Sequence, residues 1–202
     1  MTAATGRAGR LRLRRQLAAA GRAGELLDRK RRILTGELDR LELLAARTGQ
    51  AWELTARQAA LWLSRSAALD GQRGLAAATP RSPARLSVAF EGAMGVRYPV
   101  HGTVSVPEDP VRAGSSALAA ATRAHRRALD AAINHAVVTR AVALLTEEIA
   151  NTRTRQRAIE DRWIPRLEDT LGHLESQLEE LDREENLRLH WAAGQPTGGE
   201  QS

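Results

Sequence analysis

The chain has 202 residues, of which 43% are hydrophobic, only 3% are aromatic and 27% are charged, with a formal net charge of +6. So few aromatic residues favour long helices with narrow contact stripes over a thick layered core. The absence of cysteine excludes a disulfide framework and any thiolate catalytic or metal site.

No uninterrupted run of about 18 apolar residues is present, so we expect no membrane-spanning segment. The N-terminal arginines are not followed by an apolar stretch, and a secretory signal is therefore not expected either. Both observations point to a cytoplasmic protein.

Residues 1–70 are predicted to form the first long helix, running from near Arg7 to about Leu69. Its apolar or small residues recur at alternating steps of four and three, which is typical of the contact stripe, or seam, of a coiled coil. The Asp70-Gly71 pair is predicted to stop this helix. The seam positions are Leu13, Leu17, Ala20, Gly24, Leu27, Leu34, Leu38, Leu41, Ala45, Trp52, Ala59 and Trp62.

Residues 71–115 are predicted to turn the chain around, with a further short helical piece near 75–78 and a β-hairpin over about 86–106. Apolar residues alternate with polar or small ones over 86–91 and again over 96–100, and a Gly-rich turn separates the two runs. Pro99 indicates an edge position. An isolated hairpin is marginally stable in water, so we expect it to pack on the helices or on a partner.

Residues 116–191 are predicted to form the second long helix, capped by Ser115 or Ser116. Four-residue steps around Pro165 mark a slip in the repeat, and the proline removes a helical hydrogen bond, so a bend is expected at Ile164 and Pro165. Residues 192–202 are expected to be a disordered tail. The seam positions are Val138, Val142, Leu145, Ile149, Ile159, Trp163, Leu167, Leu171, Leu174, Leu178 and Leu181.

Together these elements predict an all-α dominated fold: a long antiparallel two-helix coiled coil with a small central β-hairpin region. Ten basic side chains within residues 7–32 would then lie beside eight acidic ones within residues 168–185 and be largely neutralised by them. The alternative is that the basic face stays free and binds nucleic acid, which would make the chain a coiled-coil nucleic-acid-binding protein. A plain coiled-coil scaffold is a third possibility.

The sequence has no recognisable catalytic or metal-binding pattern. No glycine-rich stretch is followed by Lys and Ser or Thr, as a phosphate-binding loop requires. The histidines are scattered, with none four residues from another, so no metal site is expected. They are His101, His125, His135, His173 and His190. We therefore expect no catalytic residue, no cofactor and no metal.

Two segments resemble the D subunit of the V-type and archaeal A-type rotary ATPases, the central rotor axle. In residues 6–34, Arg7, the pair Leu26-Leu27 and the cluster Arg29-Lys30-Arg31 follow the family pattern in order. Residues 152–189 are similar to a second family pattern, whose Ile-Pro inside a long helix is its most specific element. The matching residues there are Ala158-Ile159-Glu160, Ile164-Pro165-Arg166-Leu167, Thr170 and Asp182-Arg183-Glu184.

The resemblance implies a non-catalytic subunit of a rotary ATPase that couples ATP hydrolysis or synthesis to proton or sodium transport. Implied partners are the A and B subunits of the catalytic hexamer, the F subunit of the rotor and a C/d-type protein that couples to the membrane ring. Nucleic acid and direct membrane insertion are not implied, and the location would be cytoplasmic and peripheral to the membrane.

Candidate site residues fall into three groups under this resemblance. Contacts with the catalytic hexamer are expected at Arg7, Arg10, Arg14, Arg15 and Trp191. The bend of the shaft is expected at Ile164 and Pro165. The coupling hairpin is expected to use Phe90, Met94 and Tyr98.

Overall fold

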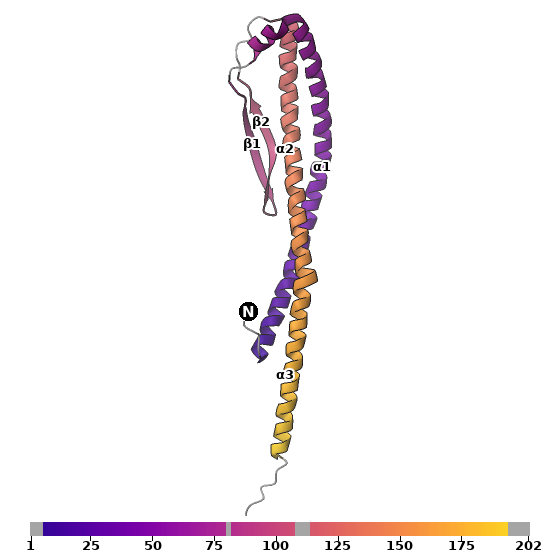
Figure 1. Cartoon of the computed structure of the whole chain (residues 1–202), viewed down its shortest axis with the longest axis vertical. Helices are drawn as coiled ribbons and strands as arrows, with labels where there is room; N and C mark the ends of the chain where they lie inside the picture. The colour runs from indigo at the N-terminus through magenta and orange to yellow at the C-terminus, as the bar shows by residue number, and fades with distance from the viewer. Residues whose placement is uncertain (1–5, 80–81, 108–113, 194–202) are drawn as a thin grey trace, which may run out of the picture. The chain divides into compact units, whose positions relative to one another are not determined.

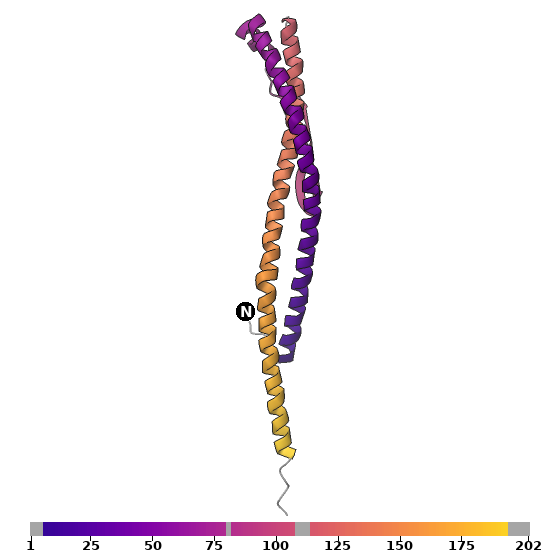
Figure 2. The same ribbon diagram turned by 90° about the vertical axis from the view of Figure 1, so that its right-hand side faces the viewer.

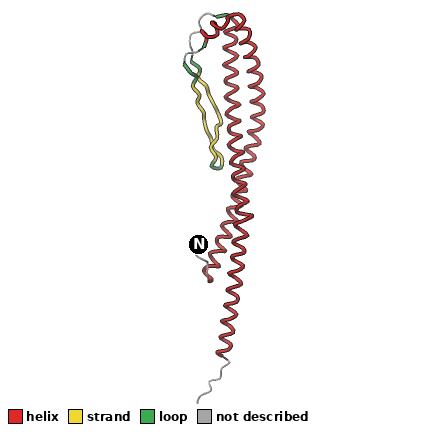
Figure 3. The backbone as a smooth tube through the Cα atoms, in the orientation of Figure 1, coloured by secondary structure: helices red, strands yellow, loops and turns green. Residues whose placement is uncertain are grey.

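The computed structural model describes residues 6–79, 82–107 and 114–193, which form long helices and one two-stranded antiparallel sheet (Figures 1 and 3). The predicted fold class is confirmed. In chain order the elements are α1 (Gly6–Ala78), β1 (Arg85–Ala93), β2 (Val96–Ser105), α2 (Ser116–Ala158), the π-helix η1 (Ile159–Trp163) and α3 (Ile164–Ala193). They fall into two compact units, unit 1 with residues 1–29 and 152–202 and unit 2 with residues 30–151.

Unit 1 is an antiparallel helix pair in which the start of α1 packs against η1, α3 and the end of α2. Its buried core is supplied by Leu13 and Ala20 from α1 and by Leu167 and Leu174 from α3. Most predicted seam positions of this unit lie in or against that core. The half-buried residues around it are Leu17, Ile159, Ile164, Leu171 and Leu178.

Unit 2 pairs the remainder of α1 with most of α2, also antiparallel, and adds the hairpin (Figures 1 and 2). One buried cluster joins all three parts, because Tyr98 of β2 packs with leucines of α1 and with apolar residues of α2. The hairpin is thus held on the helices by β2, as expected of a sheet too small to stand alone. The buried members are Leu34, Leu41, Tyr98, Val138, Ala141 and Leu145.

The hairpin pairs Arg85 with Ser105 at its open end and Ala93 with Val96 at its tip, with a bulge between Ala89 and Phe90. Its bounds agree closely with the predicted 86–106. Gly102 of β2 lies where a Cβ would come within 2.6 Å of Ile133 on α2, so only glycine lets the strand approach this closely.

The end of α1 differs in detail from the prediction. Gly71 leaves helical geometry, with φ 64° and ψ −177°, but the chain resumes helical structure up to Ala78. A glycine tolerates this positive φ without steric cost. The predicted stop at Asp70-Gly71 is therefore a kink, and the short helical piece expected near 75–78 follows it.

The predicted seam was wrong at three positions. Trp163 is 56% exposed, Leu181 is also exposed, and Trp52 lies at the surface with its ring stacked on His135, the ring centroids 5.7 Å apart. The exposure of Trp163 has a local cause in the π-helix, described below. Leu181 lies beside the beginning of the described part of α1. Its neighbour Asp182 pairs with Arg7, which is in the first turn of α1.

Candidate partner-binding surfaces

The basic start of α1 lies beside the acidic part of α3, as predicted, but the two ion pairs between their described residues amount to a partial neutralisation and not the predicted large one. Arg7 Nη2 lies 3.3 Å from Asp182 Oδ1, and Arg14 Nη2 lies 2.6 Å from Glu175 Oε1. In unit 2, Lys30 Nζ similarly donates to Glu148 Oε1 at 2.6 Å. Each surface pair contributes about 0–1 kcal/mol, so these contacts set orientation more than they add stability.

Arg10, Arg15 and Trp191 differ from Arg7 and Arg14 in their surroundings. Within the described part of the chain, neither Arg10 nor Arg15 forms an ion pair with an acidic side chain. Trp191, near the end of α3, is 79% exposed. Of the five residues predicted to contact the hexamer, Arg10, Arg15 and Trp191 are those whose side chains are not engaged by another described residue of the chain.

The predicted bend coincides with a change of helix type. Residues Ile159–Trp163 form a π-helix, and the Ile164 N–H donates to the Ile159 carbonyl, five residues back. Pro165 has no N–H to continue an α-helical ladder, and in an α-helix its ring would clash with the carbonyl of Asp161. The wider turn lies just where that clash would occur.

This π turn also explains why Trp163 is exposed. The sequence predicted a seam running from Ile159 to Trp163 to Leu167 in steps of four. The structure instead places Ile159, Ile164 and Leu167 against the core, in steps of five and three. The predicted and the observed seam both include Leu167. The extra residue of the π turn therefore moves one seam position, from Trp163 to Ile164, and leaves the rest unchanged.

Tyr98, one of the predicted hairpin residues, holds the hairpin in place. It is only 5% exposed, and its hydroxyl donates to Glu37 Oε1 at 3.1 Å. Arg40 donates to both carboxylate oxygens of Glu37, at 2.6 and 3.0 Å. We call these three residues the hairpin clasp. Glu37 and Arg40 do not stand out in the sequence, because they look like an ordinary pair three residues apart on a helix.

The hairpin clasp shifts the pKa values of all three of its members, and the hydrogen bond to Glu37 raises that of Arg40. Hydrogen bonds from Arg40, and then from Tyr98, lower the pKa of Glu37 despite its partial burial. Burial, and then the hydrogen bond to the Glu37 carboxylate, raises the pKa of Tyr98. The clasp therefore consists of a carboxylate, a charged guanidinium and a neutral phenol over the whole neutral range.

Phe90 and Met94 lie on the outside of the hairpin, unlike Tyr98. Phe90 is 48% exposed and Met94 is 43% exposed. The Arg97 guanidinium lies 4.9 Å from the centre of the Phe90 ring, within cation–π range. These two apolar side chains and one arginine form the surface of the hairpin that a partner could contact.

A polar joint links the end of the regular part of α1 to the start of α2. The Asp70 carboxylate accepts hydrogen bonds from the Ser115 backbone N–H at 3.0 Å, from the Ser115 hydroxyl and from the Ser66 hydroxyl at 3.1 Å. The Ser115 hydroxyl in turn accepts the N–H of Leu118, so Ser115 is the residue that caps α2. The hydrogen bonds from Ser115 lower the pKa of Asp70.

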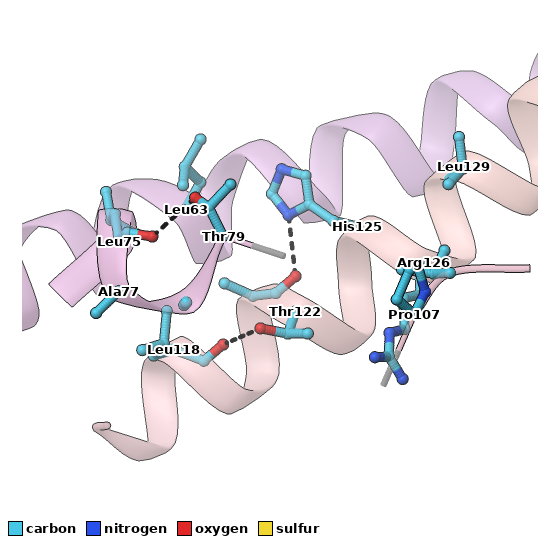
Figure 4. A pocket seen from close by; sticks show the side chains of 13 residues that line it. Leu63, Leu75, Ala77, Thr79, Pro107, Leu118, Thr122, His125, Arg126 and Leu129 are labelled. Carbon is cyan, nitrogen blue, oxygen red and sulfur yellow. Dashed lines mark hydrogen bonds between the residues drawn. The ribbon is translucent and has the colours of Figure 1, made fainter. Parts of the chain in front are cut away.

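An apolar pocket of about 360 Å³ lies in unit 2, close to this joint (Figure 4). Its walls come from the last turns of α1, from the chain after β2 and from the first turns of α2. The lining residues include Leu63 and Leu75 of α1, Pro107 of the chain after β2, and Leu118 of α2. In the described residues, no group of three or more His, Asp or Glu side chains is placed to hold a metal ion.

One helical stretch, Ser116–Trp191, has the length and apolar composition needed to cross a membrane. This stretch contains no uninterrupted apolar run of the expected length, but an 18-residue segment of it has a high average hydropathy, because at most two residues of that segment are charged. The same stretch supplies Val138, Ala141 and Leu145 to the buried core of unit 2. A core helix of this kind passes the same test of length and composition.

Nearly the whole chain, including the helix pairs, the hairpin and the Ile-Pro turn, matches one known protein family. Residues 10–194 match the family model that describes the D subunit of ATP synthase. The chain belongs to the ATP synthase D subunit family. It is 34% identical to the V-type ATP synthase D subunit of Anaeromyxobacter sp. (strain Fw109-5), over 92% of this chain and 90% of that protein.

Members of the D subunit family from other lineages are similar over the same extent. The V-type ATP synthase D subunit of Thermotoga neapolitana is 29% identical, over 94% of this chain and 96% of its own length. The A-type ATP synthase D subunit of Archaeoglobus fulgidus is 30% identical, over 89% of this chain and 90% of its own length. The similarity therefore extends through the helices and the hairpin, and is not confined to one motif.

Proposed function

We propose that this chain is the central rotor axle of a V/A-type ATPase, transmitting torque between an ATP-hydrolysing hexamer and a membrane ring that carries protons or sodium ions. The observation that carries the proposal is the match to the D subunit family over residues 10–194. Long paired helices with a hairpin fastened to them are a suitable architecture for a mechanical part. A plain spacer would need neither the hairpin nor the π turn.

The proposed assembly has four kinds of partner. The A and B subunits of the catalytic hexamer surround the part that contains both chain ends. The F subunit and a C/d-type coupling protein bind the part that contains the hairpin. The chain itself is then a non-catalytic subunit on the cytoplasmic side, peripheral to the membrane, with its apolar α2 positions used for the core of unit 2.

Within the hexamer, we assign the changing contacts to Arg10, Arg15 and Trp191. An axle has to exchange neighbours as it turns, which requires contacts that are individually weak and not already satisfied within the chain. Surface ion pairs meet the first condition at about 0–1 kcal/mol each. Arg7 and Arg14 also contact α3, so their share in the hexamer contact is smaller.

The bend and the hairpin have separate tasks in this proposal. The π turn before Pro165 changes the direction of the seam at one place, which gives the axle the asymmetry that torque requires. Phe90 and Met94 supply the outer contact of the coupling hairpin, and Tyr98 holds that hairpin at a fixed place on unit 2.

The test is to purify the tagged chain from its host and measure what accompanies it. We expect subunits of an ATP-hydrolysing hexamer in constant ratio to the chain. Reversing the charge of Arg10 and Arg15 together should lower ATP-driven ion transport severalfold, while the same reversal at Arg12 and Arg22 on the same helix serves as control. Purification of nucleic acid with the chain, or of no ATPase subunit, would contradict the proposal.

A further inference from the structure

The pocket of unit 2 is mainly apolar, although several of its lining residues are polar. The Thr122 hydroxyl donates to the Leu118 carbonyl at 3.0 Å, and the Thr79 hydroxyl donates to the Leu75 carbonyl at 3.1 Å. His125 Nδ1 lies 2.9 Å from the Ala121 carbonyl. Because these polar atoms are engaged by the backbone of their own helices, the cavity offers mainly carbon atoms to an occupant, with Arg126 as the charged residue of its lining (Figure 4).

The pocket is half open, and the leucines at its rim are partly exposed. Leu63 of α1 and Leu129 of α2 line the cavity and yet remain accessible to solvent. A small molecule bound in a protein is usually enclosed over most of its surface. An open cavity that continues into exposed leucines instead fits an apolar side chain presented by a larger partner.

The described helices around the cavity carry more basic than acidic residues. The part of α2 from Ser116 to Asp130 has three arginines and one acidic residue, Asp130, and one of the arginines, Arg126, lines the pocket. On α1, residues 61–79 add Arg65 and Arg73 against a single acid, Asp70, whose carboxylate is engaged by two serines. The other two arginines of α2 are Arg123 and Arg127.

From this combination we infer that the pocket is a docking site for a partner protein segment in which an apolar side chain is flanked by acidic residues. The apolar side chain fills the cavity between Leu63, Leu75 and Leu118, and the acidic residues pair with the arginines around Arg126. Apolar filling supplies the affinity, and the charges select the partner and its orientation. The inference rests on the proposed function: if the chain is the axle of a rotary ATPase, the partner is a subunit on the membrane side of the same rotor. We call this partner the membrane-side subunit.

Two neighbouring alanines offer a matched pair of variants. Ala77 lines the pocket and is exposed, whereas Ala76 beside it is exposed and does not line it. Ala77→Trp fills the cavity with the chain's own side chain and should lower retention of the membrane-side subunit about tenfold, the size of effect seen when an interface anchor is lost. Ala76→Trp should leave that retention unchanged.

The measurement is the amount of each subunit that stays with the tagged chain in the purified complex, by quantitative mass spectrometry. Both variants should keep the catalytic subunits and give the same melting curve by circular dichroism. Arg126→Glu should lower retention of the membrane-side subunit severalfold, and Arg126→Lys should restore it. Equal retention in the two tryptophan variants, or equal loss in both, overturns the inference while leaving the proposed function standing.

A photo-crosslinking residue placed at position 77 in the assembled complex identifies the occupant directly. The expected cross-link joins it to a protein segment with an apolar residue next to aspartate or glutamate. A cross-link to a fatty acid or lipid, to a neutral or basic segment, or to no partner overturns the inference. If the unmodified tagged chain brings down no ATPase subunit at all, the proposed function fails and the inference fails with it.

Discussion

At the scale of single residues, the hairpin clasp is the most informative contact of the molecule. Tyr98 is the only tyrosine in the sequence, and it reaches from the hairpin to Glu37 on α1 across 61 positions of the chain. Burial of a hydroxyl is costly unless it is hydrogen-bonded, and here the acceptor is a carboxylate that is itself held by Arg40. This side chain therefore fixes one point at which the hairpin rests on α1.

The clasp predicts how Tyr98 titrates. Folding raises its pKa, so the proton is held to a higher pH in the folded chain than in the unfolded one. The stability that the clasp contributes is then present below the ordinary tyrosine pKa of about 10 and is lost as the pH rises above it. The ultraviolet absorbance of tyrosinate reports this residue alone, and its midpoint should lie above that of the denatured chain.

Glu37→Gln provides the control for this titration. It removes the negative charge and keeps a hydrogen-bond acceptor, so the midpoint should fall toward the ordinary value while Tyr98 remains buried. Asp39→Asn, an exposed neighbour on the same helix, should leave the midpoint unchanged. A midpoint in the folded wild-type chain equal to that in denaturant would contradict the clasp.

At the scale of elements, two helix features decide how α2, η1 and α3 are built. The π turn before Pro165 exchanges Trp163 for Ile164 at the seam, and Ser115 in place of Ser116 caps α2. Both alternatives were compatible with the residue types alone. Only the hydrogen bonds of the folded chain distinguish them.

The exchange at the seam predicts unequal effects of two neighbouring substitutions. Ile164→Ala removes a half-buried side chain from the core of unit 1 and should cost about 1–2 kcal/mol of unfolding free energy, less than the value for full burial. Trp163→Ala removes an exposed ring and should cost less than about 0.5 kcal/mol. Urea denaturation followed by circular dichroism measures both free energies of unfolding. A larger loss of stability for Trp163→Ala would favour the seam predicted from the sequence, which runs through Trp163 in steps of four.

The cap predicts a similar contrast at the start of α2. Ser115→Ala removes the acceptor for the Leu118 N–H and one donor to Asp70, and should cost about 1–2 kcal/mol. Ser116→Ala, one residue later, should be neutral or slightly stabilising because alanine favours a helix. The melting temperatures of the two variants, measured side by side, test this contrast. Equal melting temperatures would contradict Ser115 as the residue that caps α2.

At the scale of the whole molecule, the sequence was sufficient for the long helices, the hairpin and most of each seam, but not for the π-helix η1. Leu34 and Leu41 on α1, like Val138 and Leu145 on α2, are seven residues apart, and such spacing has one simple solution in a chain that reverses once. The alternation around Val88 and Val100 likewise predicted the hairpin, because a period of two is specific to strands. Local patterns of this kind are read directly from residue types.

What the sequence could not provide are the links between distant residues of ordinary type. The contact of Tyr98 with Glu37, the joint between Asp70 and Ser115 and the pocket beside Leu118 all depend on which helix turns are brought together. No residue in these groups is unusual for its element. The predicted hexamer contacts at Arg10, Arg15 and Trp191 remain proposals for the same reason, since they concern surfaces outside the chain.

The central claim is that this chain turns relative to the catalytic hexamer. The sequence has no cysteine, so a single cysteine replacing the exposed Ser87 of the hairpin, and not the proposed contact residues Phe90 and Met94, gives this chain one attachment point for a bead. With the hexamer fixed to a surface, we predict that the bead rotates in one direction while ATP is supplied and stops when ATP is removed. ATP hydrolysis by the same complexes beneath a bead that stays still would contradict the account.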